Sequence, residues 1–290
     1  MIRYEGALFR PPSEAYSLIV QATIGCSNNT CTFCSMYKSK HFKIRPIEEI
    51  LEDFRRGRQL YSFVKRIFVA DGDALILPTD AWKKILTEIS RLFPECERVT
   101  CYATPKSVLL KTDEELKQLR QMGLQMVYMG LESGSDEILR QICKGTTSAQ
   151  IIEASQKLHA ADIDISVTAI NGLGARERME EHAIQTGRVL SEMKPAYIGL
   201  LTLLLEPGTP LYEQHKKGEF YLLNADETLK EIRLILENCD CPGCVFRANH
   251  ASNYLPLKGT LNQDKAYLLH QIDNALAGKK SLKEEWMRGL

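Results

Sequence analysis

Three cysteines near the beginning of the chain have the spacing of a metal centre. Cys26, Cys31 and Cys34 lie within the segment TIGCSNNTCTFCSMY. Three thiolates this close together can hold one metal centre, but they cannot satisfy every iron of a four-iron cluster. A cubane held by three cysteines keeps one iron open to an outside ligand, and an open iron is a place for chemistry. The pattern therefore indicates an enzyme.

Composition narrows the class of protein. Of the 290 residues, 44% are hydrophobic and 26% are charged, as in an ordinary globular protein large enough for an α/β barrel. The 37 acidic and 37 basic residues balance to a net charge of zero, which disfavours a nucleic-acid partner. The first residues, MIRYEG, lack the apolar stretch of a signal peptide, and no apolar run reaches membrane-spanning length. We expect a cytoplasmic protein with no membrane partner, whose nine cysteines are metal ligands and buried thiols.

Short apolar runs that alternate with amphipathic segments predict the fold. Between the runs lie helical patterns such as Trp82, Ile85, Leu86 and Ile89 on one helical face, and a capping box over Thr112–Glu115. Six strand–helix alternations imply parallel strands with right-handed crossovers, and therefore an α/β fold, a partial (β/α)6 TIM-like barrel. The six expected buried strands are Ser17–Cys26, Arg66–Asp73, Arg98–Thr104, Met126–Ser133, Asp164–Gly174 and Ala196–Leu205.

Three segments are expected along the chain. Residues 1–16 form an N-terminal segment, residues 17–206 the partial barrel, and residues 207–290 a C-terminal extension that covers the open side of the barrel. In the extension, helices near Leu229–Leu236 and Lys265–Leu276 flank a stretch expected to be irregular, from Cys239 to Leu261.

Residues suited to ligand binding follow each expected strand. In parallel barrels, functional groups collect at the carboxyl ends of the strands. A zinc site completed by His41 is the alternative use of the first three cysteines. Zinc does not explain the acidic and glycine motifs at the other strand ends, so an iron–sulfur centre is preferred. These motifs are Asp71-Gly72-Asp73, Thr104, Gly130-Leu131-Glu132-Ser133-Gly134, Gly172 with Gly174, and Glu206-Pro207-Gly208-Thr209.

With these motifs, the sequence resembles the radical S-adenosylmethionine (radical SAM) superfamily from the first strand to the sixth, in its branch of generic iron–sulfur oxidoreductases. The cysteines match the triad whose thiolates hold a [4Fe-4S] cluster, and Phe33 matches the aromatic residue before the last cysteine. The family usually has three residues between the first two cysteines. Here the four residues Ser27–Thr30 lie between them, which alters the first turn of the loop.

The resemblance also implies where the second cofactor, S-adenosylmethionine, binds. In the family, the acidic residue after the second strand contacts the methionine amino group, and that of the fourth strand contacts the ribose or methionyl part. Glycines after the fifth strand let the backbone approach the adenine. The cofactor contacts expected here are Gly72, Asp73, Thr104, Glu132, Gly172 and Gly174.

The implied reaction begins with reductive cleavage of S-adenosylmethionine to a 5′-deoxyadenosyl radical, which takes a hydrogen atom from a small or medium organic substrate. A reductant such as flavodoxin or ferredoxin is the expected partner. Dehydrogenation, rearrangement, decarboxylation and methyl transfer all stay open. The alternative is a non-catalytic iron–sulfur or zinc protein in electron transfer or metal binding. It is disfavoured because an electron carrier has no need of an open iron.

Two motifs of the extension have more than one interpretation. Cys239, Cys241 and Cys244 can hold a second cluster or zinc, but buried thiols are the favoured interpretation. The polar run from Arg247 to Tyr254 indicates either a buried hydrogen-bond network or a substrate site. In the second case His250 is the candidate catalytic residue, since an imidazole can transfer a proton near neutral pH.

Overall fold

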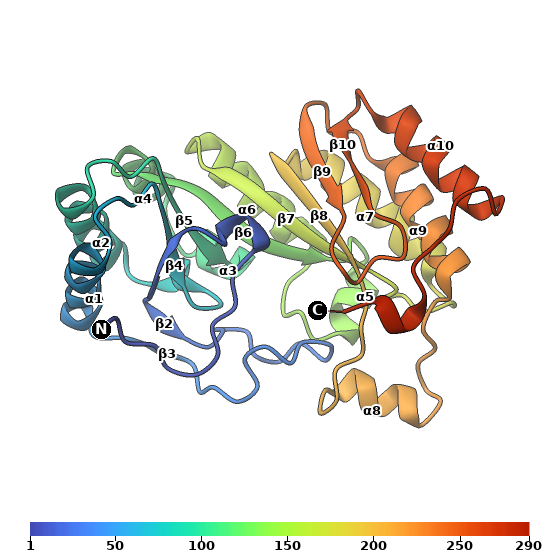
Figure 1. The fold of residues 1–290 in the computed structure, drawn as a ribbon, viewed down its shortest axis with the longest axis horizontal. Helices are drawn as coiled ribbons and strands as arrows, with labels where there is room; N and C mark the ends of the chain where they lie inside the picture. Colours follow the sequence, from blue (N-terminus) through green and yellow to red (C-terminus); the bar gives the residue numbers. More distant parts are fainter. Residues whose placement is uncertain (290) are drawn as a thin grey trace. The chain divides into compact units, whose positions relative to one another are not determined.

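The computed structural model describes residues 1–289, which form a mixed α/β fold around one sheet (Figure 1). Its strands follow the order β1-β4-β5-β6-β7-β8-β9-β10, and β2 pairs with β3 in a short ribbon. The predicted fold class, α/β with a parallel sheet, is confirmed. The strands are β1 (Leu18–Gln21), β2 (Thr23–Ile24), β3 (Lys43–Ile44), β4 (Arg66–Ala70), β5 (Arg98–Ala103), β6 (Leu124–Glu132), β7 (Asp164–Asn171), β8 (Tyr197–Thr202), β9 (Cys244–Ala248) and β10 (Leu257–Leu261).

The chain divides into two compact units. The first holds residues 1–29, 36–129 and 156–165, and the second holds residues 30–35, 130–155 and 166 onward. The boundaries expected at residues 16 and 206 stay a prediction. The helices of the first unit are α1 (Ile47–Leu60), α2 (Thr79–Leu92), α3 (Pro105–Leu109) and α4 (Asp113–Gln121), with short turns η1 (Pro12–Glu14) and η2 (Ala74–Ile76). Those of the second are α5 (Asp136–Gln141), α7 (Met179–Met193), α8 (Pro210–Lys216), α9 (Ala225–Asn238), α10 (Lys265–Leu276) and the turn η3 (Glu285–Met287), while α6 (Ser148–Ala160) has residues in both units.

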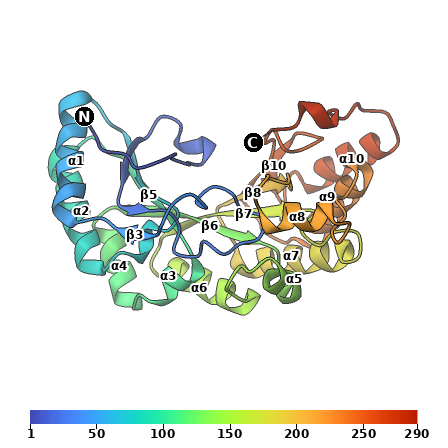
Figure 2. The same cartoon turned by 90° about the horizontal axis from the view of Figure 1, so that it is seen from below.

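The core of the first unit lies between its strands and helices. Helices α1 and α2 lie side by side (Figures 1 and 2). The predicted apolar face of α2 is buried, with Trp82 and Ile85 fully inaccessible to solvent. On the strands, Phe68, Tyr102 and Tyr128 meet edge to face, with the first two ring centroids 5.1 Å apart. Phe68 and Tyr128 are buried and Tyr102 is half-buried; full burial of a side chain such as Phe68 stabilises the fold by roughly 1.5–3 kcal/mol.

Helix α4 begins at the predicted capping box. Thr112 Oγ1 accepts the backbone N–H of Glu115 at 3.1 Å, and Glu115 Oε2 accepts the N–H of Thr112 at 2.8 Å. Gly123 follows the helix with a φ of 119°, a conformation that side chains disfavour. Both helix ends therefore form where their residue types predict.

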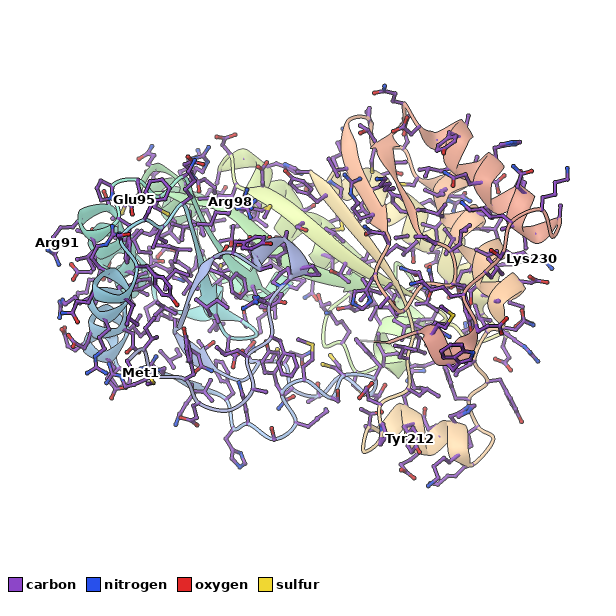
Figure 3. The ribbon with its side chains drawn as sticks, viewed as in Figure 1. Met1, Arg91, Glu95, Arg98, Tyr212 and Lys230 are labelled. Carbon is purple, nitrogen blue, oxygen red and sulfur yellow. The ribbon has the colours of Figure 1, made fainter. Side chains whose placement is uncertain are left out.

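Charged residues fix the segments around the start of two strands (Figure 3). Glu95 Oε1 accepts from Arg58 of α1 at 2.7 Å and from the backbone N–H of Val64, just before β4, at 2.8 Å. Arg98, at the start of β5, donates at 2.8 Å to the buried carboxylate of Glu14. The second pair fastens the N-terminal segment to the sheet.

The second unit packs its helices closely enough to require a glycine. At Gly187 on α7, an added Cβ would lie 2.6 Å from the carbonyl oxygen of Ile235 on α9. Glycine thus allows the backbones of α7 and α9 to approach each other. Helices α9 and α10 lie side by side (Figures 1 and 2).

The C-terminal extension differs from the expectation in one respect. The stretch predicted to be irregular contains β9 and β10, so that part of the prediction is wrong. Strand β9 pairs in parallel with β8, Ile198 opposite Phe246, and antiparallel with β10. Both strands have only five residues and carry a charged side chain, Arg247 or Lys258, which hides the apolar alternation that marks longer strands.

Candidate cofactor site

The turn after β4 brings Gly72 against the first cysteine, within the first unit. The backbone N–H of Gly72 donates to the carbonyl of Gly25 at 3.1 Å. A Cβ at position 72 would lie 2.6 Å from the ring of Tyr37 and 2.8 Å from Cβ of Cys26. Any larger residue would therefore push the cysteine loop away from the strand end.

Asp73 and Thr104 meet at the ends of β4 and β5. Asp73 is fully buried, and its Oδ2 accepts hydrogen bonds from the hydroxyls of Ser27 and Thr104, the latter at 3.0 Å. Its Oδ1 accepts the backbone N–H of Thr104 at 3.2 Å. Burial raises the pKa of Asp73, while hydrogen bonds from Ser27, Ser107 and Thr104 oppose that rise. These donors hold the carboxylate in one orientation at the ends of β4 and β5.

The remaining two cysteines lie on a segment of the second unit. Thr32, between Cys31 and Cys34, donates its backbone N–H to the carbonyl of Ile142 at 2.9 Å and accepts from the N–H of Leu211 at 3.0 Å. Two main-chain bonds thus hold this segment in place beside α5 and α8. Phe33 is half-buried there. Cys26 belongs to the first unit, so the meeting of all three thiols at one cluster stays a prediction.

Glu132 ends β6 in an ion pair that the sequence did not reveal. Its Oε1 lies 2.8 Å from Nζ of Lys144, and the two side chains are only 10% and 12% exposed. Gly130 makes room for the pair, because a Cβ there would overlap Glu132 Oε1. Oε2 is buried and has no hydrogen-bond partner among residues 1–289. A buried acceptor without a donor costs roughly 1–3 kcal/mol, so this oxygen fits a ligand that donates a hydrogen bond.

The glycines after β7 are held by a helix of the extension. Gly172 has a φ of 89°, and its N–H donates to Oε2 of Glu231 on α9 at 2.6 Å. Burial raises the pKa of Glu231 to about 8, although the bond from Gly172 lowers it. A Cβ at Gly174 would lie 2.8 Å from the carbonyl of Arg178. Sequence reasoning missed Glu231. The sequence feature that could have identified it is a carboxylate three residues after Thr228, on the buried face of α9.

The turn after β6 is fixed by a buried histidine. His182 Nδ1 lies 2.8 Å from the hydroxyl of Ser133, and its Nε2 lies 3.0 Å from the carbonyl of Ile170. Burial lowers the pKa of His182 to about 4, so the ring is neutral at pH 7. A neutral ring can accept from Ser133 and donate to Ile170, which ties the ends of β6 and β7 to α7.

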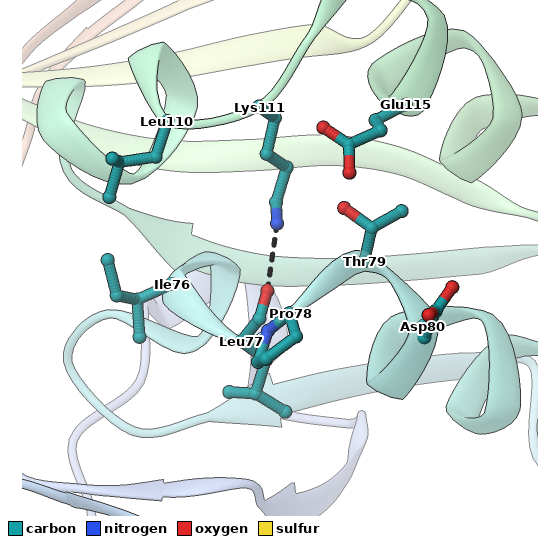
Figure 4. A pocket seen from close by; sticks show the side chains of 8 residues that line it. All are labelled: Ile76, Leu77, Pro78, Thr79, Asp80, Leu110, Lys111 and Glu115. Carbon is teal, nitrogen blue, oxygen red and sulfur yellow. Dashed lines mark hydrogen bonds between the residues drawn. The ribbon is translucent and has the colours of Figure 1, made fainter.

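Two cavities lie within single units. One, of about 350 Å³ in the first unit, contains Lys111, whose Nζ points at the carbonyl of Leu77 at 2.8 Å (Figure 4). Burial lowers the pKa of Lys111. The other, of about 310 Å³ in the second unit, has the apolar residues Ile142 and Leu211 in its wall, the same two residues that hold Thr32. It therefore borders the segment that carries Cys31 and Cys34.

The second group of cysteines is buried together. Sγ of Cys239 lies 3.5 Å from Sγ of Cys241, which also donates to the carbonyl of Leu190 at 3.1 Å. The hydrogen bond from Cys239, together with burial, raises the pKa of Cys241, and burial raises that of Cys244 to about 12. All three side chains are buried, which fits the interpretation that they are core thiols. Within residues 1–289, no three histidine, cysteine or acidic side chains have the geometry of a metal site.

The polar run of the extension is partly a structural network. Asn253 is fully buried, accepts from the hydroxyl of Thr202 at 2.8 Å and donates to the carbonyl of Leu200 at 2.9 Å. Ser252 accepts the N–H of Thr202 at 3.2 Å. These bonds fasten the loop between β9 and β10 to β8. His250 is half-buried with Nδ1 3.0 Å from the Ser252 hydroxyl, and its catalytic role stays a prediction.

A model of the radical SAM superfamily matches residues 20–186, more than half of the chain. The chain belongs to the radical SAM superfamily. This family consists of enzymes that bind a [4Fe-4S] cluster and S-adenosylmethionine, so the predicted cofactors are confirmed at the level of the family. The membership also disfavours the non-catalytic alternative.

Relatives within the radical SAM superfamily have diverse names. The ribosomal protein uS12 methylthiotransferase RimO of Caldanaerobacter subterraneus is 27% identical over 71% of this chain and 47% of its own length. The heme chaperone HemW of Bacillus subtilis is 20% identical over 73% of this chain and 57% of its own length. The chain thus spans about half the length of these curated relatives.

Solved structures share the fold at low identity. Methylornithine synthase PylB aligns over 78% of this chain and 64% of its own, with a TM-score of 0.53 and 15% identity. Elp3 of Methanocaldococcus infernus aligns over 92% of this chain and 65% of its own, with a TM-score of 0.53 and 16% identity. Across the residues that the structure describes, no helix has both the length and the apolar character needed to cross a membrane.

Proposed function

We propose that the chain is a radical SAM enzyme whose [4Fe-4S] cluster is held by Cys26, Cys31 and Cys34 and which acts on a small or medium organic substrate. The observation that carries this proposal is the contact of the Gly72–Asp73 turn with Cys26. The buried carboxylate of Asp73, bonded to Ser27 next to the first cysteine, supports the proposal because a cofactor ammonium group needs an acceptor. The family match over residues 20–186 includes all of these residues.

Each strand end has a distinct task in this proposal. Asp73, held by Ser27 and Thr104, accepts a hydrogen bond from the ammonium of S-adenosylmethionine. Glu132 offers its unpartnered Oε2 to a hydroxyl or ammonium donor, while Lys144 pairs with Oε1 and orients the side chain. Gly172 and Gly174 present backbone close to the adenine. When bound, the cofactors supply the reductive cleavage and the radical that abstracts hydrogen.

The partners are inferred from this chemistry. We propose a small protein reductant such as a flavodoxin or ferredoxin, and no nucleic-acid or membrane partner. We also propose a cytoplasmic location, because cysteines that serve as metal ligands and buried thiols are typical of a reducing compartment. His250 is proposed to contact the substrate rather than the cofactor. The reaction that follows hydrogen abstraction stays open.

Anaerobic reconstitution tests the proposal. The full chain is treated with iron and sulfide, reduced with dithionite in the presence of S-adenosylmethionine, and assayed for bound iron and for 5′-deoxyadenosine. We expect iron near four per chain and 5′-deoxyadenosine formation. The control is a variant in which Cys96 and Cys143, two cysteines outside the triad, are replaced by Ser. Iron-free wild-type protein after reconstitution, or iron uptake without cofactor cleavage, contradicts the proposal.

A further inference from the structure

We propose that Asp71, paired with Lys40, is a positioning residue for Cys26: it fixes the backbone immediately before that cysteine. This inference rests on the proposed function only in assigning Cys26 to the cluster. All the residues involved belong to the first unit. Asp71 precedes the Gly72–Asp73 turn, and neither Asp71 nor Lys40 is among the cofactor contacts assigned above.

Asp71 collects donors from three parts of the chain. Its Oδ2 accepts the backbone N–H of Gly25 at 3.0 Å, the side-chain amide of Gln21 at 3.1 Å and Nζ of Lys40 at 2.6 Å. Gly25 also accepts the N–H of Gly72 at 3.1 Å. The backbone N–H and the carbonyl of Gly25 are therefore both bonded to the turn after β4, and Cys26 is the next residue.

Lys40 connects this anchor to Asn29, the third residue of the four-residue spacer. Its carbonyl and that of Tyr37 accept from the side-chain amide of Asn29 at 3.3 Å and 2.7 Å. Lys38 Nζ donates to the carbonyl of Asn29 at 2.9 Å. Lys40 thus bonds to Asp71 through its side chain and to Asn29 through its carbonyl. Both ends of the segment from Gly25 to Asn29 are therefore fixed by hydrogen bonds.

The pair is buried, and all three donors converge on Oδ2 of Asp71, while its Oδ1 has no hydrogen-bond partner among residues 1–289. The side chains of Lys40 and Asp71 are 4% and 0% exposed. Lys40 Nζ also donates to the carbonyl of Ala7 at 2.6 Å and lies 5.4 Å from the centre of the Tyr37 ring. The desolvation of two charges offsets much of their attraction, so a buried pair contributes less to net stability than to the choice of one conformation.

The four-residue spacer between Cys26 and Cys31 explains why such an anchor is useful. Four residues between two ligands have more conformational freedom than three, and that freedom must be lost when the loop closes on a cluster. Holding Gly25 and Asn29 before the metal arrives leaves fewer bonds to fix on binding. A metal ligand is presented accurately only when its supporting hydrogen bonds are in place.

The test compares the Asp71→Leu, Lys40→Met and double Lys40→Met/Asp71→Leu variants with a Glu14→Gln control, because leucine has a similar size to aspartate but no acceptor for the Gly25 N–H. Glu14 and Arg98 form another buried ion pair of the first unit, 2.8 Å apart, and neither residue touches the segment 25–29. The first measurement is amide hydrogen exchange of peptides that cover residues 22–30 in iron-free protein. The second, after reconstitution, is the rate of anaerobic iron release to a chelator and the electron paramagnetic resonance spectrum of the reduced cluster.

The single and double variants should exchange residues 22–30 at least fivefold faster, release iron at least fivefold faster and show altered g-values. Glu14→Gln should match the wild type in all three, even if its melting temperature falls. In the double variant no buried charge is left unpaired, so stability should recover while the loop stays mobile. Wild-type exchange and iron release in the double variant would show a merely structural pair and overturn the inference. If the wild type takes up no iron, the proposed function fails, and the iron-free exchange still decides the role of Asp71.

Discussion

Gly172 and Glu231 are joined by a 2.6 Å hydrogen bond between a backbone N–H and a fully buried carboxyl oxygen. The bond couples the glycine turn after β7, where the adenine is proposed to bind, to α9 of the C-terminal extension. The other carboxyl oxygen, Oε1, has no partner within the described part of the chain. Burial raises the pKa of Glu231 to about 8, which favours the protonated acid below that pH in the folded protein.

Stability should depend on the protonation of Glu231. Its pKa is raised from 4.5 to about 8 by burial, so between these values the folded state binds more protons than the unfolded state. The free energy of unfolding then falls as pH rises through this window, by up to about 1.4 kcal/mol per pH unit from this group. Relative to the wild type, Glu231→Gln should gain stability from pH 5 to pH 8.5 in urea titrations. A pH-independent difference between the two proteins contradicts the prediction.

The three cluster cysteines should each be required for iron. Replacing any one of Cys26, Cys31 or Cys34 by Ala removes a thiolate and leaves an iron without its ligand. Iron content and the brown, oxygen-sensitive absorption should drop sharply in each variant, as measured by colorimetric iron assay and visible spectra. The assignment is wrong if the triple variant keeps its full iron content and still cleaves S-adenosylmethionine.

Asp73→Ala should weaken S-adenosylmethionine binding while the cluster remains. The change deletes an ammonium acceptor, and loss of one charge-assisted hydrogen bond corresponds to about 1.5–3 kcal/mol, or roughly 10- to 150-fold in Kd. Calorimetric titration of the reconstituted protein measures the change. Glu132→Gln is the parallel variant, since it keeps the shape of the side chain and removes the charge that faces Lys144. Wild-type affinity in the Asp73 variant would remove Asp73 from the site.

The second cysteine group should be dispensable for iron. Because the three cysteines are buried and Sγ of Cys241 donates to the carbonyl of Leu190, we expect them to be core thiols, and a triple Cys239→Ala, Cys241→Ala and Cys244→Ala variant should keep both its iron and its cofactor cleavage. It should lose some stability, since three buried side chains become smaller. Loss of about half the iron in this variant would instead indicate a second cluster.

Substitutions of His250 and Asn253 should have different effects, one on substrate turnover and the other on stability. Asn253→Ala removes two buried hydrogen bonds and should lower the free energy of unfolding by about 1–3 kcal/mol. His250→Ala should leave the iron content and uncoupled cleavage of S-adenosylmethionine intact but abolish turnover of the substrate. Thermal denaturation and product assays distinguish the two. If His250→Ala also only lowers stability, the histidine ties down the loop and has no catalytic role.

Local patterns were sufficient to predict much of the fold. Trp82 and Ile85 of α2 lie at helical spacing, and Thr112 and Glu115 form the capping box of α4 within four residues. Neighbours in sequence therefore decide both features. The pairing of Asp71 with Lys40 and of Glu132 with Lys144 depends instead on how distant segments meet. No spacing rule connects such residues. The strand-end motifs were predicted because parallel strands place their carboxyl ends at one edge, whatever the loops between them do.

The hairpin of β9 and β10 also determines what the sheet exposes to other molecules. Strand β8, with the buried Ile198 and Leu200, is covered along its edge by β9. The outermost strand is β10, which has five residues, carries the exposed Lys258, and has the Thr260 N–H bonded to Asp264 at 2.7 Å. Short, charged edges resist pairing with a second chain. A chain truncated before Cys244 would expose β8 as an unpaired, apolar edge strand. We expect such a chain to aggregate rather than remain a monodisperse, inactive protein.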